Sequence, residues 1–172
     1  MVLIGEIKVK IGVISDTHDN RDCILKAIEI FNTEKVDLVL HCGDHIAPFT
    51  LEWYKGLNAK MIGVKGNLDA EYQLLKEKYE SLGWEFHRFS AVITLERKKI
   101  ILLHGVDENV IKGLIHSDEY DIIVRGHLHK IINEWHKDTL HFSPGEACGY
   151  LTQKRTIGII ELPEISAEII EI

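Results

Sequence analysis

Cysteine is scarce in this sequence of 172 residues, and its spacing excludes two classes of small domain. The three cysteines, Cys23, Cys42 and Cys148, lie far apart and form no C-x-x-C pair. This pattern argues against a disulfide framework and against a zinc ribbon. We therefore expect reduced thiols and a cytoplasmic protein.

Long apolar runs and blocks of basic residues are also missing. No apolar stretch approaches the roughly 18 residues of a membrane span, and segment 1–5 is too short for the apolar region of a signal peptide. The formal net charge is −7, so a nucleic-acid partner is not favoured, although it is not excluded. We expect a soluble protein with no membrane partner, and the sequence leaves a homo-oligomer open.

The remaining composition is that of an ordinary globular chain. Residues 1–172 are predicted to form a single domain, long enough to bury a core without disulfides. The hydrophobic fraction of 45% and the charged fraction of 27% are unexceptional, and we find no internal repeat. Histidine is the outlier, with ten residues.

The first half of the chain repeats one pattern three times: a short apolar strand, a polar loop and a helix. Asp19 or Asn20 can cap the first of these helices. Such βα units imply right-handed crossovers and a largely parallel sheet. The predicted strands cover 7–14, 37–41 and 59–64, and the second and third helices cover 48–56 and 71–81.

The second half reads differently, because most of its strands alternate as antiparallel strands do. Two strands joined by a charged turn form a hairpin, and the last four strands read as a meander. We therefore predict an α/β fold with two β-sheets packed face to face and helices outside. The predicted elements are the hairpin 91–95 and 99–103, a helix 107–117, and strands 122–124, 131–136, 139–143, 156–162 and 165–172.

Polar side chains follow five of the predicted strands. In the segment Gly126-His127-Leu128-His129, alternation in extended backbone would point both imidazoles to one side. Ligand sites in α/β sheets lie at the carboxyl ends of strands, so we expect the five loops to converge. Their polar residues are Asp16 and His18, Asp44, Asn67 and Asp69, His104, and His127 and His129.

These residue types indicate a metal site. Carboxylates, imidazoles and one amide suit Mn²⁺, Fe, Co²⁺, Ni²⁺ or Zn²⁺ better than a thiolate site would, and no cysteine belongs to the set. The set also holds more ligands than one ion needs. Two ions that share a carboxylate are the simplest arrangement.

The ordered motifs D-x-H, G-D, G-N-x-D, H-G and G-H-x-H resemble those of the calcineurin-like metallophosphoesterase family, and in particular its small, cap-less archaeal and bacterial phosphodiesterase branch. The resemblance runs from Val9 to about Tyr150. It also includes Ser143-Pro144-Gly145-Glu146, which is similar to an N-P-G segment of that branch. The family's fold is a two-sheet sandwich with outer helices.

The resemblance implies two divalent metals, with manganese or nickel favoured. It assigns Asp16, His18, Asp44 and His129 to the first metal, and Asp44, Asn67, His104 and His127 to the second. It further implies that a metal-bridging water, held near Asp44 and Asn67, attacks the phosphorus.

Two positions depart from the family pattern. Many relatives have a histidine after the G-N asparagine, where this chain has Leu68, and many have H-G-H, where this chain has Val106. Neither residue can protonate a leaving group. We therefore expect slow turnover or a substrate with a good leaving group, and no side-chain acid is assigned.

The leading functional hypothesis is a dinuclear metal-dependent phosphodiesterase that acts on a small phosphoester. One alternative is a non-catalytic protein-binding scaffold of the same fold, as in the retromer subunit that the family includes. Another is a phosphomonoesterase. Retention of all seven matched ligand positions favours an enzyme.

The other polar residues have competing structural interpretations. His45, Asn20 and Asn67 are candidates to contact substrate. Asn20 and Lys65 could contact phosphate, but helix capping for Asn20 and a solvated strand end for Lys65 are the favoured interpretations. His41 is expected in the core, and Asp69 is expected to orient its loop. The remaining histidines are expected at the surface or in hairpins, and the tryptophans in the core or an interface: His87, His116, His136, His141, Trp53, Trp84 and Trp135.

Overall fold

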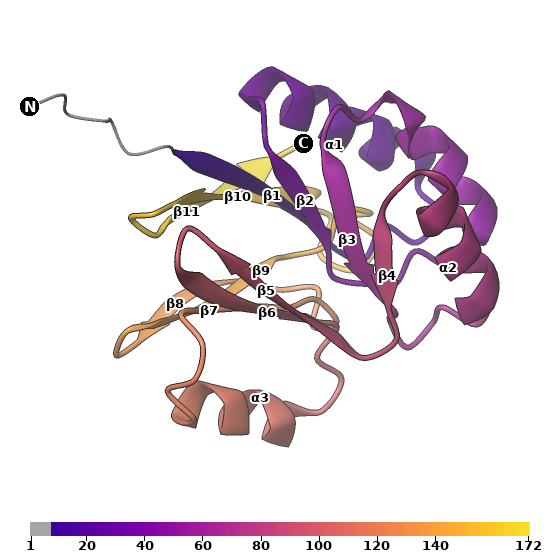
Figure 1. The fold of residues 1–172 in the computed structure, drawn as a ribbon. Coiled ribbons are helices and arrows are strands. Elements are labelled where there is room, and N and C mark those ends of the chain that lie inside the picture. Colours follow the sequence, from indigo (N-terminus) through magenta and orange to yellow (C-terminus); the bar gives the residue numbers. More distant parts are fainter. Residues whose placement is uncertain (1–7) are drawn as a thin grey trace, which may run out of the picture.

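The computed structural model describes residues 8–172 and contains two β-sheets packed face to face (Figure 1). Ile7, predicted to begin the first strand, and segment 1–5 lie outside the described residues. The first half follows the predicted βα order, with one additional strand, β4. Its elements are β1 (Val9–Ile14), α1 (Arg21–Glu34), β2 (Leu38–His41), η1 (Pro48–Gly56), β3 (Lys60–Val64), α2 (Tyr72–Ser81) and β4 (Glu85–His87).

The second half supplies the other sheet and then returns to the first. The hairpin β5–β6 turns at Glu96 and Arg97, both with positive φ, which suits a two-residue hairpin turn. The elements are β5 (Ser90–Leu95), β6 (Lys98–Leu103), α3 (Glu108–His116), β7 (Ile122–Val124), β8 (Ile131–His136), β9 (Thr139–Pro144), β10 (Thr156–Leu162) and β11 (Ser166–Glu171).

Strand pairing confirms the two-sheet prediction but corrects the meander. The six-stranded sheet has the order β11-β10-β1-β2-β3-β4, and the five-stranded sheet has the order β5-β6-β7-β9-β8. The pairs β8–β9 and β10–β11 are antiparallel, as predicted. They belong to different sheets, however, because β9 pairs in parallel with β7 whereas β10 pairs with β1.

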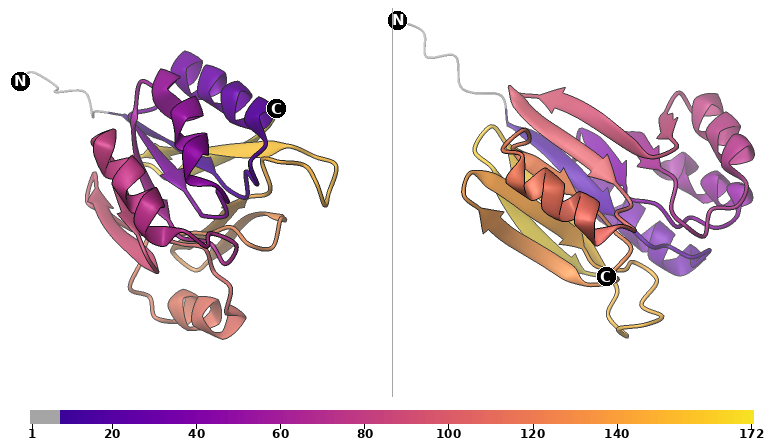
Figure 2. Two further views of the ribbon diagram at one scale, coloured as in Figure 1. Left: turned by 90° about the vertical axis from the view of Figure 1, so that its right-hand side faces the viewer. Right: turned by 90° about the horizontal axis from the view of Figure 1, so that it is seen from below.

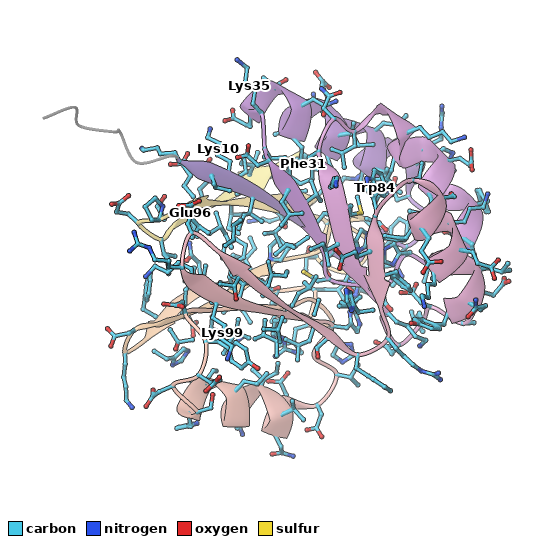
Figure 3. All side chains as sticks on the ribbon, in the orientation of Figure 1. Lys10, Phe31, Lys35, Trp84, Glu96 and Lys99 are labelled. Carbon is cyan, nitrogen blue, oxygen red and sulfur yellow. The ribbon has the colours of Figure 1, made fainter. Side chains whose placement is uncertain are left out.

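Helices cover the outer faces of both sheets (Figure 2). Side chains of α1 and α2 such as Phe31 and Tyr79 pack on the six-stranded sheet, and Figure 3 shows Phe31 and Trp84 on this side. A second cluster, including Val13, Val124 and Phe142, fills the space between the sheets. Helix α3 covers the five-stranded sheet around Ile111.

Local chemistry explains where the helices begin. The Asn20 side chain accepts a hydrogen bond from the Cys23 amide, and the Asp107 side chain accepts one from the Asn109 amide. Segment 48–56 was predicted as a helix and is a 3₁₀-helix with Pro48 in its first turn. In the described part of the chain, no helix has the length and apolarity needed to cross a membrane.

Candidate metal centre

The polar loops predicted to converge do meet, at one end of the sandwich. Parallel pairing aligns β1, β2 and β3 in one sheet and β6, β7 and β9 in the other, so their carboxyl ends face the same way within each sheet. The structure thereby brings together all seven predicted residues: Asp16 and His18 after β1, Asp44 after β2, Asn67 after β3, His104 after β6, and His127 and His129 after β7.

A first group of atoms surrounds one oxygen of Asp16. The Oδ1 atom lies 3.4 Å from His129 Nε2 and 3.8 Å from His18 Nε2. His18 Nε2 is also 3.7 Å from Asp44 Oδ2. Asp16 Oδ1 and His18 Nε2 are buried and have no hydrogen-bond partner, which is unusual for buried polar atoms. A cation between these atoms would satisfy both.

A second group surrounds Asn67. Its Oδ1 atom lies 2.8 Å from His104 Nε2 and 2.9 Å from His127 Nδ1, and His104 Nε2 is 3.5 Å from Asp44 Oδ2. His104 Nδ1 donates to the carbonyl of Cys42 at 2.8 Å. In a neutral imidazole, Nε2 then carries a lone pair that faces two oxygens. A cation between these atoms would remove the repulsion between the nitrogen lone pair and the two oxygens. The donor set therefore fits divalent transition metals.

The carboxylates favour positive charge at this cluster. Asp16 raises the pKa of His18 above its ordinary value. Burial alone would lower the pKa of His104, but the hydrogen bond and negative charge of Asp44 outweigh burial and raise it. The pKa of His127, by contrast, is lowered by burial and by the neighbouring His104. Protons and metal ions compete for these ring nitrogens.

Left-handed backbone is concentrated in the same residues. Asp16, His18, Asp44, His127 and His129 have φ values of 52°, 41°, 57°, 70° and 55°. Aspartate and histidine tolerate this region better than most residues, but each such conformation still carries strain. The prediction that the side chains of His127 and His129 point to the same side is wrong, because β7 ends at Val124 and the backbone at these two residues is not extended. The two rings point to different groups, His127 to Asn67 and His129 to Asp16.

Two glycines allow the loops to approach so closely. A Cβ atom on Gly66 would lie 2.1 Å from Asp44 Oδ1, and a Cβ atom on Gly126 would lie 1.9 Å from Ser15 Oγ. Any side chain at either position would displace the loops that carry Asp44 or Asp16. These glycines are therefore part of the geometry of the site.

Asp69 orients the β2 and β3 loops, in agreement with its predicted role. The buried carboxylate accepts hydrogen bonds from the backbone amides of Asp44, Gly66 and Ile46 at 3.1, 2.8 and 2.8 Å. Burial raises its pKa, but the charge and hydrogen bond of His45 together with these amides lower it further than burial raises it. The ionised form of Asp69 thus holds the loop of Asp44.

The structure gives two of the candidate substrate contacts structural roles inside the protein. His45 is fully buried, with Nδ1 3.2 Å from Asp69 Oδ2 and Nε2 2.7 Å from the Tyr79 hydroxyl. Both ring nitrogens are engaged inside the protein, where His41 stacks on the same ring. Asn20 caps α1 and donates to the Cys148 carbonyl at 3.1 Å, so its structural role accounts for both ends of its amide.

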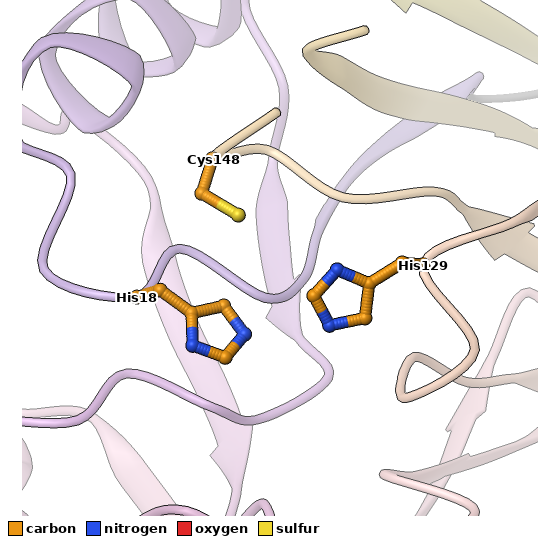
Figure 4. A group of neighbouring side chains, drawn as sticks. All are labelled: His18, His129 and Cys148. Atoms are coloured by element: carbon orange, nitrogen blue, oxygen red, sulfur yellow. The ribbon is translucent and has the colours of Figure 1, made fainter. Parts of the chain in front are cut away.

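Two further residues of the site were missed from the sequence. Glu146, fully buried after β9, accepts a hydrogen bond from His129 Nδ1 at 2.7 Å. This fixes the ring so that Nε2 faces Asp16. Cys148 lies beside His18 and His129 (Figure 4) and donates to Glu146, and burial raises the pKa of its thiol to about 12. The rule used for the other strand ends also applies to β9 and would have found Glu146.

The positions that depart from the family pattern are open to solvent. Leu68 and Val106 are 52% and 55% exposed. Beside His104 there is an apolar groove of about 360 Å³ whose lining includes Lys65, Arg88 and Phe89. A substrate can therefore reach the cluster without passing a lid in the described part of the chain.

Comparisons with known proteins agree with this fold and identify the family. Residues 9–164 match the calcineurin-like phosphoesterase superfamily domain. The chain is 41% identical over 155 residues to a phosphodiesterase of Methanocaldococcus jannaschii, covering 89% of this chain and 93% of that protein. It also resembles the solved structure of an archaeal phosphodiesterase, with a TM-score of 0.92, 38% identity, and coverage of 95% of this chain and 100% of that one.

A more distant likeness concerns the fold alone. Vacuolar protein sorting 29 from Cryptosporidium parvum is 19% identical, with a TM-score of 0.72 and coverage of 97% of this chain and 99% of that one. The match over residues 9–164 and the 41% identity establish the family directly. The chain therefore belongs to the calcineurin-like phosphoesterase superfamily.

Proposed function

We propose that this protein is a metal-dependent phosphodiesterase that uses two divalent transition metals, with manganese or nickel favoured over iron, cobalt or zinc. Asp44 carries the proposal, because its Oδ2 atom faces His18 on one side at 3.7 Å and His104 on the other at 3.5 Å. The first ion would be held by Asp16, His18, Asp44 and His129, and the second by Asp44, Asn67, His104 and His127.

When bound, two such ions activate water as a nucleophile and neutralise the phosphoryl oxygens. The chain's residues set the positions of the ligands. The Cys42 carbonyl and Glu146 fix the rings of His104 and His129. No proton donor stands at Leu68 or Val106, so substrates with good leaving groups are expected to react fastest.

A diester substrate is favoured over a monoester by two observations. The M. jannaschii relative is named a phosphodiesterase, and 41% identity covers nearly the whole of both chains. The groove beside His104 offers apolar surface and the cations of Lys65 and Arg88, where the second substituent of a diester can lie. The non-catalytic scaffold remains the alternative from another class, and retention of all seven ligand positions argues against it.

We further propose a single-domain cytoplasmic enzyme acting on a small phosphoester. The net charge of −7 disfavours a nucleic-acid substrate. Whether the enzyme forms a homo-oligomer is decided by light scattering of the purified protein.

Chelation tests the proposed function. Hydrolysis of a chromogenic phosphodiester is expected to be abolished by a chelator and restored by Mn²⁺ or Ni²⁺, because the proposed activity uses metal ions to activate the water. The diester should also be hydrolysed faster than the matching monoester. Activity that persists after complete removal of metal, verified by elemental analysis, would contradict the proposal.

The division of ligands between the two ions has its own test. His129→Ala is expected to lower the affinity for the first ion, and His104→Ala the affinity for the second, each by at least ~10-fold. Changes to residues that only contact the ligands already lower metal affinity by ~10–100-fold. Elemental analysis of the purified variants measures the metal retained. His116→Ala, on the exposed end of α3, is the matched control. Loss of both ions in both single variants would argue against separate sites.

A further inference from the structure

A second cluster of potential ligands lies on the edge of the five-stranded sheet, away from the strand-end loops. Glu134 and His136 occupy alternate positions of β8, the edge strand, and His141 on β9 pairs with Glu134. The neighbours of His141 on β9, Leu140 and Phe142, pack between the sheets. Since alternate residues of a strand face opposite ways, His141 faces outward on the side covered by α3.

The side chains converge closely enough to share one ion. One ligand atom from each of Glu134, His136 and His141 lies within 4.8 Å of the others. His136 Nε2 is 3.8 Å from Glu134 Oε2, and the two rings have centroids 5.9 Å apart. In a tetrahedral zinc site with bonds of about 2.0–2.2 Å, the ligand atoms lie only slightly closer together than these two atoms do.

Unpaired buried nitrogens indicate that the cluster lacks a partner. The Nε2 atoms of both histidines are buried and have no hydrogen-bond partner, and His141 is only 7% exposed. A buried polar atom without a partner is costly, and such atoms in folded proteins call for an explanation. Both histidines belong to the group of three residues that converges, so one bound cation can account for both unpaired nitrogens.

The chemistry of the cluster suits zinc. Two imidazoles and a carboxylate, with a fourth position open to water, form a common zinc ligand set. Burial, followed by the charges of Arg125 and His136, lowers the pKa of His141 to about 4, so this ring is neutral near pH 7. The charge of Arg125 is in turn paired with Glu108 at 2.6 Å. Glu134 and His136 are 67% and 39% exposed, so an ion can enter from solvent.

We propose that Glu134, His136 and His141 bind one zinc ion, which joins the edge strand β8 to β9. The site shares no residue with the seven candidate ligands at the strand ends. It can therefore be tested independently of the proposed phosphodiesterase activity. Its expected effect is structural: zinc closes the edge hairpin and raises its resistance to unfolding.

Zinc titration of the full chain tests this site. The wild type is expected to bind one more equivalent of Zn²⁺ than His136→Ala, whose affinity at this site should fall at least ~100-fold, since even outer-sphere changes cost up to that much. Glu134→Gln, at a more exposed position, provides a second variant. His116→Ala is the matched control, and phosphodiester hydrolysis should be unchanged in all three.

The outcomes separate the two proposals. A His136-dependent equivalent of zinc supports the edge site even if the phosphodiesterase assay fails. Equal zinc binding by wild type, His136→Ala and Glu134→Gln overturns it, whatever the enzyme does. Added zinc should also raise the melting temperature of the wild type more than that of His136→Ala, and equal shifts would likewise overturn the site.

Discussion

Replacing Asp44 with asparagine is expected to reduce phosphodiester hydrolysis by at least ~10³-fold, which corresponds to about 4 kcal/mol in the barrier. Asp44 Oδ2 faces imidazoles of both groups, at 3.7 Å from His18 and 3.5 Å from His104. Asparagine keeps the size of the side chain but removes the charge that neutralises the ions. Both metals should therefore bind more weakly, and both are needed for the nucleophile and for charge stabilisation.

The measurement is kcat/KM together with the metal content of Asp44→Asn at saturating Mn²⁺. Asp138→Asn, an exposed position with the same change of charge, is the matched control and should keep wild-type activity. Circular dichroism checks that the variant is folded. An Asp44→Asn protein that retains both metals and most of its activity would rule out the shared-carboxylate arrangement.

Substitution of Glu146 is expected to have the second largest effect. Its carboxylate accepts hydrogen bonds from His129, Cys148 and the backbone amides of Tyr150, Leu151 and Thr152. Glu146→Ala leaves these largely part-buried donors without an acceptor, so we expect a loss of about 1–3 kcal/mol in the free energy of unfolding. Glu146→Gln should fold better but bind the first ion ~10–100-fold more weakly, because the ring of His129 is no longer held by a charged acceptor.

Acid titration separates the contribution of the negative charge of Glu146 from that of the size and shape of its side chain. Its hydrogen bonds with Thr152, His129 and Cys148 outweigh burial and lower its pKa to about 2, from an ordinary value of 4.5. A carboxyl with a lowered pKa stabilises the fold above its unfolded-state value and loses that contribution as the pH falls from about 4.5 towards 2. The difference in the free energy of unfolding between wild type and Glu146→Gln, here called the stability gap, should therefore decrease as the pH falls over this range.

Denaturant unfolding at several pH values, with Glu164→Gln as an exposed control, measures this gap. Metal affinity is measured on the same variants near neutral pH. A gap that stays constant down to pH 2, or a Glu146→Gln protein with wild-type affinity for the first ion, would show that the negative charge has no such role.

The polar residues at the strand ends could be predicted from the sequence, because each depends on a local pattern. A buried strand is followed almost at once by a carboxylate or imidazole at Asp16, Asp44 and His104, and parallel topology then brings them together. Glu146 follows the end of β9 and so fits the same pattern, but most of its partners lie in the six residues after it, in a loop whose path has no periodic signal. His45 was misplaced because adjacency to Asp44 in sequence does not fix which way a ring points.

The fold shows the same division between local and non-local information. The helix cap Asn20 was one of two candidates that the residue types indicated, whereas Asp107, predicted as the first helical residue, proves to be the cap. Strand β4 was missed because it is three residues long, and of these only Phe86 is fully buried. The assignment of β10 to the first sheet depends on pairing with β1, about 150 residues earlier in the chain, and alternation alone contains no such information.

The seven candidate ligands come from both sheets, and this has a consequence for how the molecule comes apart. Asp16, His18, Asp44 and Asn67 follow strands of the six-stranded sheet, whereas His104, His127 and His129 follow strands of the five-stranded sheet. Each proposed ion would thus be clamped between two layers that are otherwise joined mainly by apolar contact. Metal loading should couple the two halves of the chain into one cooperative unfolding unit, and slight separation of the layers would switch off hydrolysis before either sheet melts.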